Sequence, residues 1–284
     1  MENAEFCIVL HIGQTQTLTV SRSAPVGLYL ICEDAQEVLL PNRFVSDSMQ
    51  PGSQVDVFVY KDSEDRMVAS TQTPYMELGD FELLEVVAVN RVGAFADWGL
   101  DKHLLIPFRE QNRPMVVGGY YLVHLYLDQA SQRLVGSTKV NKFLQTENLY
   151  VQDGQKVWIL CSEERENGMQ VIVNNRYRGI VYHNEGGSEL KLGQRMEAYV
   201  SKVRLEGLLD IRLHPIGRNR IPKFESQILE ALDRANGHLP FGDKSSPEVI
   251  QQTFGMSKKA FKETCGSLYK KGIISIEKEQ ISLC

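Results

Sequence analysis

The sequence lacks several features that would place it in a specialised class of protein. Its five cysteines are scattered and never form a CxxC pair, so they give no zinc spacing and are typical of free thiols in a reducing compartment. No apolar run approaches the roughly 18 residues of a membrane-spanning helix. The N-terminal residues lack a basic segment followed by a long apolar core. We therefore expect a cytoplasmic protein without a membrane partner.

Signatures of catalysis are also missing. The chain has no HExxH, no nucleophile elbow and no GxxxxGK[ST] phosphate loop. Its six histidines are dispersed without metal spacing, and Asp97 and Asp101 are explained by roles in a turn. The sequence predicts no enzyme, no cofactor and no metal.

An excess of positive charge is absent as well. The net charge is −5, while 43% hydrophobic and 24% charged residues are ordinary for a soluble globular protein. The molecule as a whole does not indicate a polyanionic partner, so any nucleic-acid site needs locally concentrated positive charge.

What the sequence does contain is an internal repeat. Proline and glycine stand eleven residues apart in Pro41–Gly52 and in Pro107–Gly118, and in each copy apolar residues follow the glycine at +3, +5 and +7. A weaker third copy, Tyr182–Gly193, has the same spacing, with tyrosine in place of the proline. Repeats with matching spacing indicate a tandem array of one unit.

Each unit is predicted to be a small β-barrel. Apolar residues alternate with period two, and glycines or small polar residues separate the runs. In the middle unit five strands are expected to begin near Phe81, Gly93, His103, Gly119 and Leu134. Five antiparallel strands in a closed unit of about 65 residues favour an OB-fold.

The last part of the chain changes to helical spacing. Helices are expected from Phe224 to about Asn236, after the N-cap Ser246, and after the N-cap Ser257, followed by two short strands, 274–276 and 281–283. The chain is thus predicted to be mostly β and multidomain, with three tandem five-stranded OB-fold barrels and an α+β winged helix-turn-helix domain. The expected bounds are 1–75, 76–145, 146–218 and 219–284.

Two regions concentrate positive charge. The third helix carries five lysines and one glutamate between Ser257 and Gly272, and its apolar face is expected to contain Phe261, Cys265, Leu268 and Tyr269. Arginine and aromatic residues alternate in and after the third barrel, as single-stranded nucleic acid requires for stacking and phosphate contact. A solvated lysine face and barrel-core tyrosines are the structural alternatives. The candidate nucleic-acid residues are Arg176, Tyr177, Arg178, Tyr182, His183, Arg195, Lys202, Arg204, Arg212, Arg218, Arg220, Lys258, Lys259, Lys262 and Lys270.

Four segments resemble one known family. "GAFADWGLDKHLLIP", "VDVFVYKDSEDRMVAST", "VIVNNRYRGIVYHNE" and "SSPEVIQQTFGMSKKAFKETCGSLYKKG" are similar to the conserved virulence factor B family of bacteria. The resemblance implies three OB repeats of the ribosomal-protein S-one type, a winged helix, RNA binding and regulation of gene expression, including virulence regulation. Repeats of this type usually carry an aromatic before "GAF" and a histidine where Pro107 stands, whereas the third copy has Tyr182-His183. This departure favours the third barrel as the RNA surface.

The leading hypothesis is a cytoplasmic protein that binds single-stranded RNA through the third barrel and the winged helix. The first two barrels would add contact area or hold a protein partner. The first alternative is a DNA-binding transcriptional regulator that uses the winged helix, because a helix-turn-helix places one helix in the major groove. The second alternative is a protein-binding adaptor, which the net charge of −5 leaves open.

Overall fold

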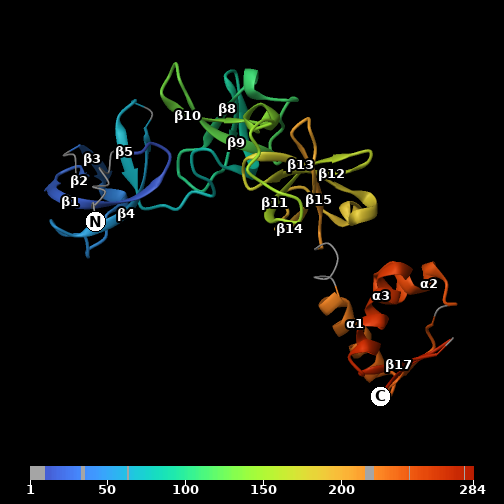
Figure 1. Ribbon diagram of the computed structural model, residues 1–284. Coiled ribbons are helices and arrows are strands. Elements are labelled where there is room, and N and C mark those ends of the chain that lie inside the picture. Colours follow the sequence, from blue (N-terminus) through green and yellow to red (C-terminus); the bar gives the residue numbers. More distant parts are fainter. Residues whose placement is uncertain (1–9, 33–35, 63, 215–220, 243, 278) are drawn as a thin grey trace.

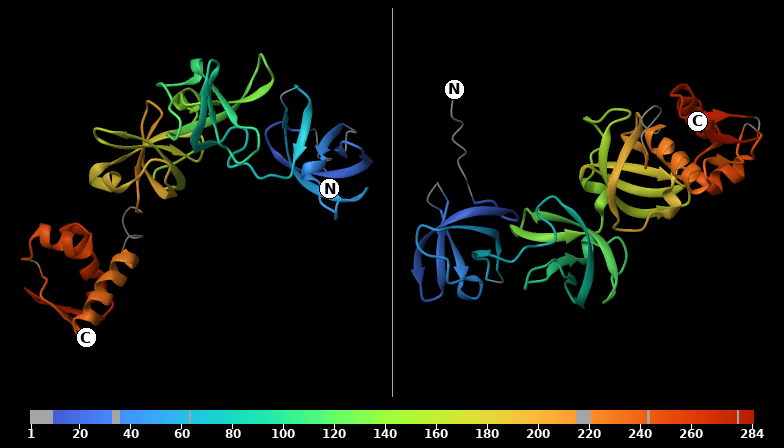
Figure 2. Two further views of the ribbon diagram at one scale, coloured as in Figure 1. Left: turned by 180° about the vertical axis from the view of Figure 1, so that it is seen from behind. Right: turned by 90° about the horizontal axis from the view of Figure 1, so that it is seen from below.

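Three β units follow one another along the chain, and a helical domain comes after them (Figures 1 and 2). The computed structural model describes residues 10–32, 36–62, 64–214, 221–242, 244–277 and 279–284, with residues 221–223 described for their backbone alone. This architecture confirms the predicted fold class of OB-type units followed by a winged helix.

The first and third units are closed five-stranded barrels with the same strand order. The first is built, in chain order, from β1 (Thr15–Ala24), β2 (Gly27–Ile31), β3 (Glu37–Pro41), β4 (Gln54–Lys61) and β5 (Met67–Ser70). The third is built from β11 (Lys156–Arg165), β12 (Gly168–Val173), β13 (Tyr177–Tyr182), β14 (Arg195–Val203) and β15 (Leu208–Arg212). In both, the strand that ends the unit pairs parallel with the third strand and closes the sheet.

The middle unit curls but does not close. It contains β6 (Phe81–Asn90), β7 (Gly93–Ala96), β8 (Leu104–Pro107), β9 (Tyr120–Asp128) and β10 (Arg133–Ser137), in the sheet order β10-β9-β6-β7-β8. The predicted strand starts are correct to within one residue, but the prediction of closure is wrong for this unit. Side chains of β8 fill the space beside Gly136 of β10, so packing holds these edges together without a ladder.

Strand register confirms the internal repeat. A glycine opens the second strand of each barrel and pairs with the residue that the repeat aligned, as Gly27 with Pro41, Gly93 with Pro107 and Gly168 with Tyr182. At all three glycines the φ angle is positive, and an added Cβ would lie 2.0–2.3 Å from a carbonyl oxygen of the facing strand. Only glycine allows the two strands to approach this closely.

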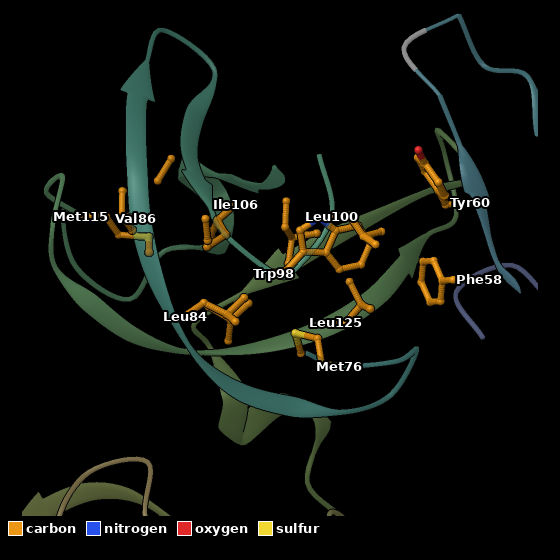
Figure 3. Close-up of a cluster of buried hydrophobic side chains, with 14 of the residues drawn as sticks. Phe58, Tyr60, Met76, Leu84, Val86, Trp98, Leu100, Ile106, Met115 and Leu125 are labelled. Atoms are coloured by element: carbon orange, nitrogen blue, oxygen red, sulfur yellow. The ribbon is translucent and has the colours of Figure 1, made fainter. Parts of the chain in front are cut away.

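Neighbouring barrels share buried side chains. Between the first two, Phe58 of β4 lies edge-on to Trp98, with ring centroids 5.6 Å apart, within a core that continues to Leu125 (Figure 3). Between the second and third, Phe81 and Leu122 pack with Leu160, Ile172 and other residues in a smaller cluster. The outward-facing positions of β11 and β12 are therefore partly covered by the middle unit.

The C-terminal domain agrees closely with the predicted winged helix. It contains α1 (Ile221–Arg234), β16 (His238–Leu239), α2 (Pro247–Phe254), α3 (Lys258–Lys270), β17 (Ile274–Ile276) and β18 (Ile281–Leu283). Ser246 and Ser257 cap their helices by accepting from the N–H three residues on. The short β16, which joins β18, was not predicted. Tyr269 was placed on the apolar face and is instead 59% exposed.

Candidate nucleic-acid interface

The third barrel presents cationic side chains on one outer surface. Along β13 the side chains alternate, so Val181 lies in the core while Arg178 and Tyr182 point outward. The neighbouring strands β15 and β14 place Arg212 and Lys202 on the same side of the sheet. We call the outward residues Arg178, Tyr182, Lys202, Arg204 and Arg212 the barrel-three face.

Two arginines of the barrel-three face already have partners within the protein. Arg204 forms an ion pair with Asp210, with Nε and Oδ1 2.9 Å apart, and also donates to the Tyr182 hydroxyl. The hydrogen bond to Asp210 raises the pKa of Arg204 above its usual value. Arg212 lies 3.7 Å from a Glu185 oxygen. The Arg204 contacts hold its side chain in place and orient the Tyr182 ring, whereas the buried Nε of Arg212 makes no hydrogen bond among the described residues.

Arg178 and Lys202 have more capacity for a ligand. The Nε of Arg178 is buried and, within the described part of the chain, has no hydrogen-bond acceptor. A buried donor without an acceptor costs about 1–3 kcal/mol, so a ligand that supplies an acceptor would gain from binding there. Lys202 is exposed on the same side of the sheet.

Three of the predicted candidates lie elsewhere in the barrel. Tyr177 begins β13 in the inward phase and is 3% exposed, so its ring belongs to the core and offers no face for stacking. Arg195 donates to the carbonyl of Phe81 at 2.5 Å and pairs with Glu82 at 3.0 Å, which ties barrel three to barrel two. His183 is exposed, and its Nε2 lies 3.1 Å from a backbone carbonyl oxygen.

Arg176 lies in the turn before β13, next to aromatic rings that the sequence reasoning missed. Its Nε donates to Gln145 at 2.7 Å, and its guanidinium lies 5.9 Å from the centre of the Tyr150 ring. Tyr150 is 77% exposed, and Trp158, which bonds to Asn174 in the same turn, is 60% exposed. In β11, Trp158 lies between Val157 and Ile159, which both face the core. Because side chains alternate along a strand, this position predicts an outward-facing ring and could have identified Trp158 from the sequence.

Helix α3 carries the second cationic surface, which we call the lysine face: Lys258, Lys259, Lys262 and Lys270. Lys262, Gly266 and Lys270 follow one another at a spacing of four, so they lie on one side of the helix. The opposite side packs into the domain core through Phe261 and Leu268. The glycine lies in the middle of the lysine face, and an added Cβ would meet no atom within 4 Å.

A fifth lysine at the end of α3 has a structural role. Lys271 bonds to both carboxylate oxygens of Glu225 on α1, at 2.8 and 2.7 Å, and Ser267 also donates to this carboxylate. Burial alone would raise the pKa of Glu225, but these hydrogen bonds lower it below its usual value. The contact holds α3 against α1 and leaves the other lysines facing outward.

Arg218 and Arg220, which were predicted to connect the two surfaces, lie outside the described residues. No described helix is long and apolar enough to cross a membrane. Among the described residues there is also no group of three or more histidine, cysteine or acidic side chains that could hold a metal ion.

Comparison with known proteins assigns a domain type to each end of the chain and relates most of its length to one family. Residues 12–72 match an S1 domain, and residues 226–283 match a CvfB-like winged helix domain. Conserved virulence factor B of Staphylococcus haemolyticus is 30% identical over 246 residues, which cover 84% of this chain and 82% of the relative. The chain belongs to the conserved virulence factor B family.

Two further similarities extend over nearly the whole chain. The Bacillus subtilis protein YitL is 26% identical over 275 residues, covering 92% of this chain and 89% of that protein. A solved structure from Streptococcus pneumoniae, described as a multidomain protein with nucleic acid binding domains, is 22% identical and covers 96% of this chain and 98% of its own, with a TM-score of 0.39. S1 domains are OB-folds, and OB-folds and winged helices are types of domain that bind nucleic acids.

Proposed function

We propose that this member of the conserved virulence factor B family is a cytoplasmic, non-enzymatic regulator that binds single-stranded RNA and acts on gene expression after transcription. The RNA would lie on the barrel-three face and on the lysine face of α3. The observation that carries the proposal is the concentration of outward cations on these two surfaces of a chain whose net charge is −5. We further propose the domain bounds 1–75, 76–145, 146–218 and 219–284.

The chemistry of both surfaces favours single strands over a base-specific duplex complex. Tyr182 on the barrel-three face supplies one ring on which an unpaired base can stack, and the exposed Tyr150 and Trp158, near the turn that precedes β13, supply two more. The exposed side of α3 offers lysine, which contacts phosphates, and lacks the arginine, asparagine and glutamine that most often read base edges in a major groove.

A DNA-binding transcriptional regulator is the second candidate, and the observation in its favour is the winged helix with a basic third helix. In that case the barrels would serve as an arm for protein contacts. Under the leading proposal barrels one and two add binding area or hold a protein partner.

The two candidates are separated by titrating the full chain with labelled single-stranded RNA and with duplex DNA over a range of salt concentrations. We expect tighter binding to RNA and a steep dependence on salt. The double variant Lys202→Glu with Lys262→Glu alters one lysine on each surface and should weaken RNA binding at least tenfold. Lys139→Glu, which reverses an exposed lysine of barrel two, is the control. Tighter binding to duplex DNA would support the transcriptional regulator instead.

A further inference from the structure

Lys102 places a primary amine at a cavity between the first barrel and the second. The cavity has a volume of about 260 Å³, and its walls come from both units: Lys61 belongs to β4, whereas Phe95, Lys102 and Arg133 belong to the middle unit. We call it the junction cavity. The volume lies below the usual range for drug-sized ligands, so the space suits a reagent of only a few heavy atoms.

The side chain of Lys102 is held in one position. It is half-buried, and its Nζ donates to the backbone carbonyl of Lys61 across the junction at 3.1 Å. The indole N–H of Trp98 donates to the backbone carbonyl of Lys102 at 2.5 Å, which fixes the main chain at the same residue. The amine is therefore anchored at both ends of its residue, and only one of its N–H bonds is used by the Lys61 carbonyl.

The surroundings of Lys102 favour the unprotonated amine. Burial lowers the pKa of Lys102, and the charge of Arg133 acts in the same direction, whereas Asp62 and Asp65 oppose the shift by less. Asp62 pairs with Arg66, and Asp65 pairs with Arg133, so both carboxylates are bound to other cations. A lower pKa leaves more of the amine unprotonated at neutral pH, and the unprotonated amine is the nucleophile.

The junction cavity also attracts anions. Lys61 and Arg133 line it together with Lys102, His103 is a further lining residue, and no carboxylate is among the described residues that do so. Because a cleft lined by one sign of charge concentrates ions of the opposite sign, an anionic reagent gathers beside the amine. Phe95 and the buried Trp98 supply an apolar wall on which a small acyl group can lie.

From this combination we propose that Lys102 is a modification site that is acylated by small acyl phosphates. The lone pair of Nζ attacks the carbonyl carbon of the reagent, the bond from that carbon to the phosphate oxygen breaks, and inorganic phosphate leaves with the electron pair. The nitrogen gives up one proton to water, so the product is a neutral secondary amide and neither an oxidant nor a reductant is needed. Lys61 and Arg133 hold the phosphate of the reagent during the attack.

Acylation changes the charge of the junction and leaves its hydrogen bond possible. The amide keeps one N–H, which can still donate to the Lys61 carbonyl. Of the three cations that line the cavity from lysine and arginine, two remain after the reaction. The site includes no residue of the barrel-three face or of the lysine face, so the proposal does not depend on the proposed RNA surface.

Lys139 is a matched control in the same unit. Its Nζ also donates to a backbone carbonyl, that of Arg109 at 2.7 Å, but its side chain is exposed and does not line the cavity. The full chain is incubated with acetyl phosphate at neutral pH, and the acetylation of each lysine is followed over time by mass spectrometry of its peptides. We expect Lys102 to react roughly tenfold faster than Lys139, because the cavity raises the local concentration of the reagent.

Three further measurements separate the causes of this preference. With N-acetoxysuccinimide, a neutral acetyl donor without a phosphate, the preference for Lys102 over Lys139 should fall several-fold. In the variant Lys61→Gln, shown to be folded by its unfolding curve, the preference with acetyl phosphate should also fall, whereas that with the neutral donor should not, because Lys61 does not contribute to the shifted pKa of Lys102. As the pH is raised, the rate at Lys102 should level off at a lower pH than the rate of a lysine model peptide.

Two results would contradict the proposal. Equal rates at Lys102 and Lys139 with acetyl phosphate would overturn it. A preference for Lys102 that is the same with both donors would overturn the assignment to acyl phosphates, because the cationic lining would then play no part. Both results are independent of the RNA affinity that is measured with the Lys202→Glu, Lys262→Glu variant.

Discussion

Replacing Gly266 by alanine should change stability and RNA affinity in opposite directions. Glycine inside an exposed helix costs about 0.5–1 kcal/mol relative to alanine. The position lies within the 13 residues of α3, and an added Cβ would meet no atom of the chain within 4 Å. Nothing in the domain offsets the gain in helix propensity, so Gly266→Ala should raise the melting temperature of this small domain by roughly 2–8 °C.

Binding should respond differently because of what surrounds the position. Gly266 lies between Lys262 and Lys270, at the centre of the lysine face. A missing Cβ lets the helix backbone approach a phosphate chain closely, and a methyl group there would separate the helix from it. We expect Gly266→Ala to weaken RNA binding about tenfold, equivalent to about 1.4 kcal/mol.

Two measurements on the full chain test this prediction. Circular dichroism at the helical band reports on the winged helix, because the three described α-helices all lie in that domain. Fluorescence anisotropy with labelled single-stranded RNA at fixed salt gives the affinity. Gln252→Ala, an exposed position on α2, is the control and should change neither quantity much. If Gly266→Ala is more stable but binds RNA with unchanged affinity, the RNA backbone does not approach α3 closely at this position, and the reasoning is refuted.

Three other predictions test the barrels. Gly93→Ala should lower the free energy of unfolding by more than about 1 kcal/mol, because the added Cβ would lie 2.3 Å from the Ile106 carbonyl oxygen. Gly118→Ala is the control: an added Cβ there would meet no atom within 4 Å, so it should lower the free energy of unfolding by less. Thermal unfolding of both variants measures the difference. Burial lowers the pKa of His124 from 6.5 to about 4. The folded state therefore loses stability as the pH falls from about 6.5 towards 4, by at most about 3 kcal/mol, and a His124→Gln variant with the same pH profile of unfolding would contradict this. Tyr177→Phe should leave RNA affinity unchanged in the anisotropy titration, and a tenfold loss would show that this buried residue matters for binding.

The winged helix was predictable because its signals are local. A serine that caps a helix and a glycine that ends one act within a few residues of the chain, as at Ser246, Ser257 and Gly255. The two-residue strand β16 was missed because it has no periodic pattern and forms only by pairing with β18, more than forty residues later. Tyr269 was misassigned because one aromatic at the edge of an apolar stripe fits either side of a helix.

The candidate site was predictable in part. Alternation along β13 correctly indicates that residues of opposite phase face opposite sides, but it does not say which phase faces the core. From the sequence, Tyr177 could either stack on a base or pack inside the barrel. The closed sheet places its ring among the core residues.

The sequence by itself determined the repeat, the strand register and the helix ends, because glycine spacing, period-two alternation and capping residues act over short distances. The tertiary structure decided which outward side chains stay available. Arg195 had the charge and the phase of a binding residue, yet it bonds to Phe81, which is 114 residues away in the chain. Contact between barrels depends on the shapes of two folded surfaces, and no pattern within either repeat specifies it.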